Sequence, residues 1–351
     1  MTVARAVVTM GCPCSIGPEV AIMAALEQRA ARIALVGDYG AALAVAAGRG
    51  IDPRLFVRVA EPCAAWTLPR GRLAIWQPTG DLAEADRRLG LPTRAAGAAQ
   101  LAWVDAAADS VARREADALV TGPVSKEQIV RSRAPGSRGF LGHTEHLQKR
   151  LHAREVVMAF WSASLVTSLA TTHLPLARVP RALSASSVAR ATYWLAWLLS
   201  RLSRRVPRIA VAALNPHAGE GGLLGGEEGT RINPGIRRAR ARLRKAGVAA
   251  TIEGPIPAES AFRLAVAGRW DGVVAMYHDQ ATIPMKVIGF GEAVNVSLGL
   301  PIVRTSVDHG TAYDRAGAWS ADSSGMRSAI ELAAKLAKAP RRAIGTRGTD
   351  P

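Results

Sequence analysis

Residues 208–222 read RIAVAALNPHAGEGG, and this stretch contains the pattern on which the fold prediction depends. Its first part, Arg208–Ala213, is a short apolar run that suits a buried strand, and it ends at a turn rich in proline and glycine. The same pattern recurs along the chain, so we expect further strands at 6–10, 32–36, 73–76, 118–121, 156–160, 165–170, 250–252 and 272–277.

Helical patterns separate these runs. Residues 98–114 carry apolar side chains at helical spacing, which predicts an amphipathic helix. A second helix is expected over 187–204, with Ser186 and Ser187 as its cap, and its apolar centre suits either a core helix or a subunit interface. Alternating strands and helices predict an α/β fold with a largely parallel sheet.

Size and composition exclude several classes of protein. The 351 residues suggest two domains, and a hydrophobic content of 49% is enough for a core, which excludes a disordered chain or a fibre. Three cysteines exclude a disulfide scaffold, and no apolar run approaches the length of a membrane span. The start of the chain is β-like and lacks the features of a signal peptide, so we expect a cytoplasmic protein.

The net charge of +17 has two explanations. The first is a polyanionic partner such as nucleic acid. The second is a GC-rich genome, because only six of the 45 basic residues are lysine and the codons of Arg, Ala, Gly and Pro are GC-rich. The densest basic runs lack the interleaved aromatic residues of a single-strand binding groove, and this favours the second explanation over nucleic acid. These runs are 201–208, 237–245 and 335–347.

Three histidines directly follow predicted strands, namely His173, His217 and His278. Because ligands bind at the carboxyl ends of parallel strands, we expect these side chains to lie at one edge of the sheet. Imidazoles bind Zn, Co, Ni or Mn, and three of them leave coordination positions open for substrate oxygens. The alternative is that each histidine is an ordinary polar residue at a strand end.

Other polar residues suggest an anion site. Lys126 follows a predicted strand, and Lys286, Asn295 and Arg304 recur within a segment of short strands and glycine turns. These side chains could hold a phosphate or a carboxylate, although each could equally be a surface residue. The loop 11–19, GCPCSIGPE, could offer backbone N–H groups to an anion or could be a plain turn.

Eight segments in order resemble one family, the 4-hydroxythreonine-4-phosphate dehydrogenases of vitamin B6 biosynthesis. The resemblance implies two α/β/α domains around a cleft, like those of isocitrate and isopropylmalate dehydrogenases. It places a nucleotide-side domain at 1–140 plus 300–351, and a domain with the metal site and the dimer interface at 141–299. The segments are IGPE (16–19), TGPVSK (121–126), GHTEHL (142–147), LATTHLPL (169–176), LNPHAGEGG (214–222), GPIPAES (254–260), MYHDQ (276–280) and 289–317.

The resemblance also implies residue roles. A divalent metal (Zn, Mg, Co, Mn or Ni) would bind His173, His217 and His278, the last from the partner subunit of a homodimer. NAD or NADP would bind without the usual glycine fingerprint. The resemblance leaves the general base open, and Lys126, Glu259 and a metal-bound hydroxide are the candidates. The substrate contacts implied are His143, Thr144, Lys286, Asn295 and Arg304, and the nucleotide-side loop is Asp308, His309 and Gly310.

The function implied is NAD(P)- and metal-dependent oxidation, with decarboxylation, of 4-phosphohydroxy-L-threonine to 3-amino-2-oxopropyl phosphate. Two alternatives remain: the same chemistry on a phosphorylated threonate or erythronate or on a cyclic dihydrodiol carboxylate, and a nucleic-acid-binding or non-catalytic relative. The sequence departs from the family pattern at positions that the resemblance places in the pocket wall, and these departures affect the choice of substrate more than the reaction. The positions are Cys12, Cys14, Leu223, Leu224, Glu259 and Thr282.

Overall fold

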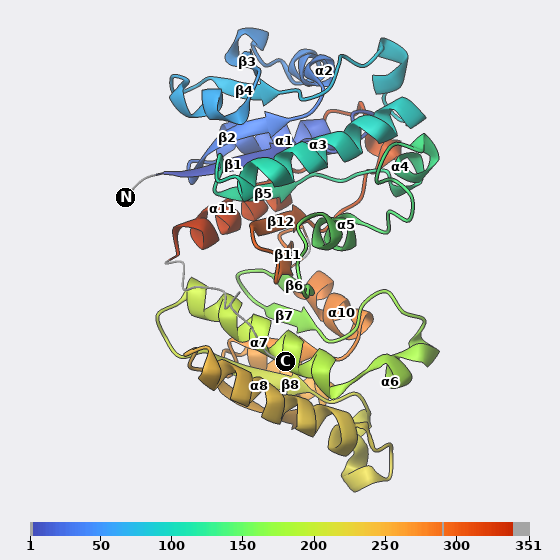
Figure 1. Cartoon of the computed structure of the whole chain (residues 1–351), viewed down its shortest axis with the longest axis vertical. Helices are drawn as coiled ribbons and strands as arrows, with labels where there is room; N and C mark the ends of the chain where they lie inside the picture. Colours follow the sequence, from blue (N-terminus) through green and yellow to red (C-terminus); the bar gives the residue numbers. More distant parts are fainter. Residues whose placement is uncertain (1–2, 290, 340–351) are drawn as a thin grey trace. The chain divides into compact units, whose positions relative to one another are not determined.

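The computed structural model describes residues 3–289 and 291–339. The chain divides into two compact units (Figure 1). Within the described residues, the first unit comprises 3–156 and Leu300–Lys338, and the second comprises 157–289, 291–299 and Ala339. Both contain a sheet covered by helices, so the predicted α/β class is confirmed.

The sheet of the first unit is parallel throughout. Its strand order is β3-β4-β2-β1-β5-β12, and each pairing in the described part of this unit is parallel. The carboxyl ends of the strands therefore meet at one edge. The strands are β1 (Ala4–Thr9), β2 (Ala31–Val36), β3 (Phe56–Val59), β4 (Leu73–Trp76), β5 (Ala118–Thr121) and β12 (Val303–Val307).

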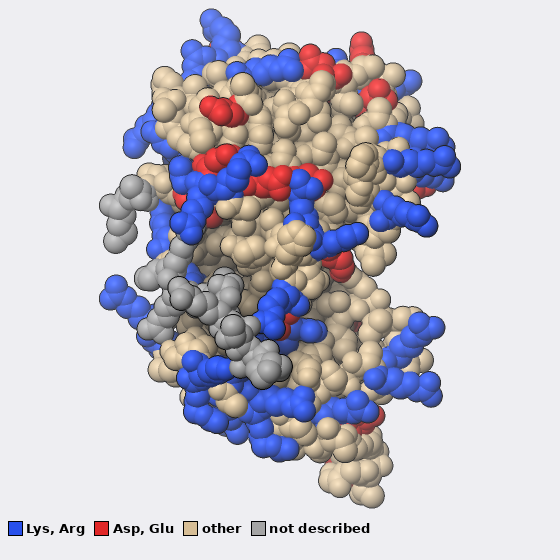
Figure 2. Space-filling model, viewed as in Figure 1, with Lys and Arg blue, Asp and Glu red and all other residues tan. Residues whose placement is uncertain are grey.

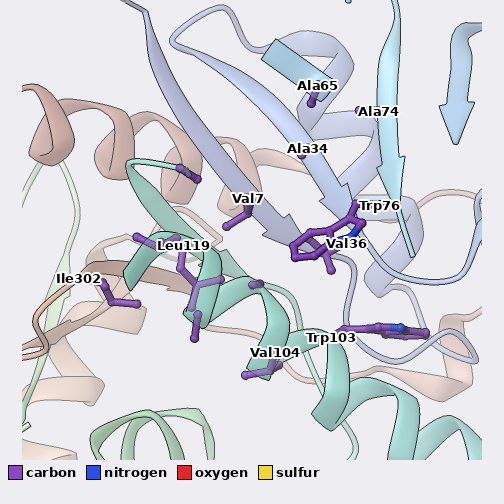
Figure 3. Close-up of a cluster of buried hydrophobic side chains, with 14 of the residues drawn as sticks. Val7, Ala34, Val36, Ala65, Ala74, Trp76, Trp103, Val104, Leu119 and Ile302 are labelled. Atoms are coloured by element: carbon purple, nitrogen blue, oxygen red, sulfur yellow. The ribbon is translucent and has the colours of Figure 1, made fainter. Parts of the chain in front are cut away.

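Helices cover both faces of this sheet. Helix α3 (Arg94–Ala112) places Trp103 and Val104 against one face, where they join a buried apolar cluster with side chains of the strands (Figure 3). The other face packs against α1 (Gly17–Glu27) and α11 (Ser324–Lys338), which contact each other. Each large apolar side chain buried in this way contributes about 1.5–3 kcal/mol.

The predicted helix at 98–114 is confirmed as α3, but it begins earlier, at Arg94. Thr93 is the reason, because its hydroxyl accepts a hydrogen bond from the N–H of Ala96 and so caps the helix.

The sheet of the second unit is mixed. Its strand order is β11-β6-β7-β10-β8-β9; the pairings of β6 with β11 and β7 are antiparallel, and those among β7, β10, β8 and β9 are parallel. The largely parallel sheet expected from the sequence is thus confirmed, with an antiparallel part around β6. The strands are β6 (Val157–Trp161), β7 (Val166–Leu169), β8 (Arg208–Ala212), β9 (Thr251–Ile256), β10 (Gly272–Ala275) and β11 (Val294–Leu298).

Alternation along β10 explains the layers of this unit. Gly272 points toward α7 (Ala185–Leu202), where an added Cβ would lie 3.1 Å from Cδ1 of Leu199. Val273 and Ala275 point the other way, into a core shared with α9 (Ala258–Val266) and α10 (His278–Ile288). The apolar centre of α7 is buried within the chain, as a core helix requires.

The predicted cap of α7 was wrong. Ser184 caps the helix by accepting a hydrogen bond from the N–H of Ser187, and the hydroxyl of Ser187 accepts one from the N–H of Ser184. This reciprocal capping box starts the helix at Ala185 rather than at residue 187.

The boundary between the units differs from the one expected at residue 140. Residues 141–156 belong to the first unit, because α5 (His143–Arg150) is tied to α3 by an Arg150–Asp109 ion pair of 2.6 Å. The functional roles given to the two domains stay predictions. The remaining α-helices of the described residues are α2 (Tyr39–Arg49), α4 (Lys126–Ser132), α6 (Val179–Ala182) and α8 (Asn233–Lys245).

Basic side chains are spread over the visible surface rather than confined to one groove (Figure 2). Several arginines of α8 have structural contacts: the guanidinium of Arg240 donates to the carbonyl of Ile252 at 2.6 Å, and that of Arg242 lies 3.8 Å from the ring centroid of Tyr193. Within the described residues, no helix is both long enough and apolar enough to cross a membrane.

Candidate functional site

Arg304 is a buried cation in the first unit. It lies on β12, its side chain is 3% exposed, and its Nη2 donates a hydrogen bond of 2.6 Å to Oγ1 of Thr121, the last residue of β5. Burial lowers the pKa of Arg304 to about 9, so the guanidinium is still charged at neutral pH. A charge in this position is stabilised by an anion, and the surface alternative considered for Arg304 is wrong.

His143 is the second member of this site. It is the first residue of α5, and its buried Nε2 has no hydrogen-bond partner among the described residues. Burial lowers the pKa of His143 well below its usual value, and the positive charges of Arg304, His146 and Lys126 lower it further. The imidazole is therefore neutral at pH 7, with one ring nitrogen available to a ligand.

Lys126 and Thr144 complete the group. Lys126 opens α4, and a Cβ added at Gly142 would lie 3.6 Å from its Nζ, so the ammonium lies beside the N-terminus of α5. Thr144 is buried in the first turn of that helix. Arg304 and the exposed Lys126, a helix N-terminus and a neutral imidazole with an available nitrogen outweigh the single carboxylate of Glu145 beside Gly142, and they form a site suited to an anion. We call these residues, with Thr121, the anion pocket.

A network of ion pairs fixes α5 in place. Nε2 of His146 lies 2.5 Å from Oδ1 of Asp105 on α3, and Arg150 pairs with Asp105 at 3.0 Å and with Asp109 at 2.6 Å. These side chains are largely buried or half-buried, so the pairs are less screened than ordinary surface pairs. The network holds the start of α5, and with it His143, against α3.

The loop after β1 lies at the same end of the first sheet. The chain passes Gly11 with a φ of +77°, and a Cβ there would lie 2.2 Å from the carbonyl oxygen of Pro123, so only glycine fits. The N–H of Ile16 donates to the carbonyl of Thr311 at 3.3 Å, which ties this loop to the segment that contains Asp308, His309 and Gly310. His309 and Gly310 are exposed.

Two buried thiols stand where the resemblance leads one to expect an aspartate and a small residue. The hydroxyl of Tyr313 donates to Sγ of Cys12 at 3.3 Å, and Sγ of Cys14 donates to the carbonyl of Asp86 at 3.2 Å. The thiol of Cys14 lowers the pKa of Cys12, and the same contact, together with burial, raises the pKa of Cys14. No pattern in the sequence pointed to Tyr313, which lies 301 residues from Cys12 in the chain.

In the second unit, the structure brings His173 and His278 together. Their ring centroids are 5.4 Å apart, His173 follows β7, and His278 opens α10 directly after β10. The hydroxyl of Thr171 donates to the carbonyl of Met276 at 2.7 Å, which joins the two loops. This juxtaposition follows from the parallel pairing of β7 with β10.

A contact with the next residue orients the ring of His278. Its Nδ1 lies 2.7 Å from Oδ1 of Asp279, which leaves Nε2 as the nitrogen that can face a metal ion. Gln280 holds the start of α10, because its amide donates to the carbonyl of Ala213 at 2.8 Å and its oxygen accepts from the N–H of Met276 at 2.6 Å. The HDQ motif thus contributes one candidate ligand and two side chains that hold it.

His217 lies in a left-handed turn after β8 and is exposed. Within the described residues, no three His, Cys, Asp or Glu side chains gather closely enough to hold a metal ion. The expected clustering is therefore seen for His173 and His278, while His217 does not join them in this chain. Of the remaining candidates in this unit, Lys286 and Glu259 are exposed, and Asn295 is half-buried on β11.

Comparisons with known proteins identify the relatives of this chain. A curated relative from Geobacter metallireducens, named 4-hydroxythreonine-4-phosphate dehydrogenase, is 41% identical over 348 residues, covering 97% of this chain and 98% of the relative. A crystal structure of the enzyme of that name from Klebsiella pneumoniae has a TM-score of 0.80 at 30% identity and covers 95% of this chain and 100% of its own. A Salmonella typhi relative named for D-threonate 4-phosphate is 35% identical over 332 residues, covering 94% of this chain and 98% of its own.

Fold, site and relatives together define an α/β enzyme of the dehydrogenase class. A family model described as "Pyridoxal phosphate biosynthetic protein PdxA" matches residues 44–333. The chain belongs to this family, and the resemblance read from the sequence motifs is confirmed.

Proposed function

We propose that this chain oxidises and decarboxylates 4-phosphohydroxy-L-threonine to 3-amino-2-oxopropyl phosphate, a step of pyridoxal phosphate biosynthesis, with NAD or NADP as hydride acceptor. Family membership supports the reaction, as does the name of the 41% identical relative. The observation that carries the proposal is the anion pocket. A buried arginine, a lysine and a helix N-terminus gather around a neutral imidazole, and this arrangement suits the phosphate or carboxylate of such a substrate.

Each residue of the anion pocket has a distinct role in this proposal. The Arg304 guanidinium offers planar, charge-assisted hydrogen bonds, and Lys126 offers a point charge. Nε2 of His143 supplies one further hydrogen bond, and its direction depends on the tautomer. Thr144 would bind through its hydroxyl or the N–H groups of the first turn of α5. Lys286 and Asn295 are proposed as further contacts, on the family resemblance.

We further propose that a divalent metal ion binds through His173, His217 and His278. Two of these imidazoles already lie together, and the Asp279 contact orients His278, so the donor set present fits such an ion. Imidazoles suit Zn, Co, Ni or Mn better than Mg. When bound, the metal would polarise the substrate hydroxyl and stabilise negative charge during loss of CO2.

The protein must also accept the hydroxyl proton. The carboxylate of Glu259 can accept it directly, whereas Nζ of Lys126, a member of the anion pocket, can accept it only as the neutral amine and not as the ammonium that binds an anion. The segment Asp308, His309 and Gly310 is proposed for the nucleotide side. Its link to the loop after β1, through Ile16 and Thr311, gives that segment a fixed base on the first sheet.

A homodimer with a shared metal site is part of this proposal. Helix α10, which begins with His278, exposes an apolar face, with Ile283 at 62% and Val287 at 80% exposure. A contiguous exposed apolar face of this kind is typical of an interaction site, and a subunit contact is one such site. A second copy would cover it. The family resemblance implies that the partner's His278 completes the metal site, whereas the described chain already brings its own His278 beside His173. The cytoplasmic location stays a prediction.

D-threonate 4-phosphate is the second candidate substrate, and the Salmonella typhi relative favours it. The test is NADH formation by the metal-loaded protein with each substrate in turn, expressed as kcat/KM. We expect 4-phosphohydroxy-L-threonine to have the higher value. Turnover of D-threonate 4-phosphate alone would assign the protein to the second substrate, and turnover of neither would contradict the proposed function.

A further inference from the structure

The turn that carries His217 has an unusual backbone. Residues His217, Ala218, Gly219, Glu220 and Gly221 all have positive φ, with values of 51°, 55°, 81°, 44° and 65°. L-residues seldom adopt this left-handed conformation, and three of the five carry a Cβ. A run of this kind persists only where the surrounding structure holds it.

Glu228 supplies that hold. Its Oε1 accepts hydrogen bonds from the backbone N–H groups of Leu214, at 3.0 Å, and of Asn215, at 2.8 Å. Its Oε2 accepts one of 3.0 Å from the side-chain amide of Asn215. The carboxylate therefore binds the two residues that lead into the turn through three donors.

The same carboxylate also contacts the middle of the turn. A Cβ added at Gly219 would lie 2.8 Å from Oε2 of Glu228, so the turn passes directly over it. Glu228 is 6% exposed and stands at the start of a π-helical turn, Glu228–Ile232, that leads into α8. Hydrogen bonds from Asn215 and Leu214 keep its pKa low despite burial, which matches an ionised acceptor.

We propose that Glu228 is a positioning residue, whose carboxylate holds the left-handed turn so that the imidazole of His217 is presented to the metal ion. This inference rests on the proposed role of His217 as a ligand. The carboxylate accepts from the backbone two residues before His217 and lies against Gly219 two residues after it, so the turn is held on both sides of the histidine.

Substitution of Glu228 tests this directly. Glu228→Gln is close to isosteric, but it replaces one of the two carboxylate oxygens with an NH2 group. This group is a donor and cannot accept hydrogen bonds from the N–H groups that face it. Glu228→Asp keeps the charge but shortens the reach. Glu253→Gln is the matched control, since it removes one carboxylate from an exposed position on β9 of the same unit. His217→Ala removes the proposed ligand itself.

The measurement is the affinity of the metal-free, full-length protein for Zn²⁺ alone, by titration calorimetry with a competing chelator. Hydrogen exchange of the 214–222 amides and the thermal midpoint of the metal-free protein are recorded alongside. We expect Glu228→Gln to weaken Zn²⁺ binding by about 10- to 100-fold and to speed exchange at Leu214 and Asn215. Glu228→Asp should be intermediate, and Glu253→Gln should match the wild type.

The outcomes separate the two claims. If His217→Ala weakens Zn²⁺ binding while folded Glu228→Gln and Glu228→Asp bind like the wild type, the ligand set stands and the positioning role is overturned. If His217→Ala binds Zn²⁺ like the wild type, the ligand set is wrong and the inference falls with it. If Glu228→Gln does not fold, the same comparison is made with Glu228→Asp, whose weaker binding at an unchanged thermal midpoint would support the role.

Discussion

The guanidinium of Arg304 donates a hydrogen bond of 2.6 Å to the hydroxyl of Thr121. A buried positive charge on a side chain of β12 thus lies at the carboxyl end of β5. The two strands are parallel neighbours, with Ser306 opposite Thr121. The arginine is therefore fixed by the sheet itself. In the proposed reaction it binds the anionic part of the substrate.

The first prediction concerns this arginine. Arg304→Gln should reduce kcat/KM by about 10- to 100-fold, because a charge-assisted hydrogen bond contributes about 1.5–3 kcal/mol. Arg304→Lys should recover part of the loss, since it keeps the charge but not the planar fork. Steady-state kinetics on the metal-loaded protein measure both. If Arg304→Gln has the same kcat/KM as the wild type, the proposed role of Arg304 in binding the substrate is wrong.

The second prediction concerns the basic surface. Arg237 and Arg244 are exposed on α8, and Arg237→Gln together with Arg244→Gln should leave turnover unchanged. This follows from the GC-rich explanation of the net charge. The same double variant serves as the control for Arg304→Gln. Loss of turnover, or tight and strongly salt-dependent binding of nucleic acid by the wild type, would revive the polyanion alternative.

The third prediction concerns pH. The folded-state pKa of His143 lies below the unfolded value of about 6.5, so the unfolded chain binds more protons below that pH. The free energy of unfolding should therefore fall as the pH drops below about 6.5, with a slope of up to about 1.4 kcal/mol per pH unit from this group. His143→Asn should flatten the slope. Urea unfolding at several pH values measures the slope. If His143→Asn has the same slope as the wild type, His143 is not the cause of the pH dependence.

The fourth prediction concerns the attachment of α5. Asp105→Asn should lower the free energy of unfolding by about 1–3 kcal/mol, because His146 and Arg150 lose a charged, half-buried acceptor. It should also raise KM, since α5 carries His143. Glu127→Gln is the control: it breaks an exposed pair with Arg131, which contributes at most about 0.5 kcal/mol. Equal effects of the two variants would contradict the account.

Much of the fold could be predicted from the sequence, because buried strands such as β8 and β10 are plain apolar runs. Strand β12 was not among the predicted strands, because Arg304 interrupts its apolar pattern and only the structure reveals that this arginine is buried. Strand β3 is short and follows a 3-10 turn, so its pattern is weak. Ser184 was missed as a cap because three serines occur close together at 184–187.

The candidate site was predictable only in part. The strand-end argument brought His173 and His278 together correctly, since their strands are neighbours. The left-handed turn at His217 could not be foreseen, because it depends on Glu228, eleven residues further along the chain. Lys126 and Arg304 were named from the sequence as candidates for an anion site, and His143 and Thr144 were named through the family resemblance. Only the structure reveals that Arg304 is buried and lies close enough to His143 to lower its pKa.

The most direct test of the proposed reaction is the joint measurement of NADH and CO2 from 4-phosphohydroxy-L-threonine with the metal-loaded wild-type protein. We predict that both form in equal amounts, that a chelator stops both, and that added metal restores both. NADH without CO2 would contradict the assignment of oxidative decarboxylation. Turnover that persists in the wild type with the chelator, and that is also unchanged in His278→Ala, would contradict its dependence on a metal ion.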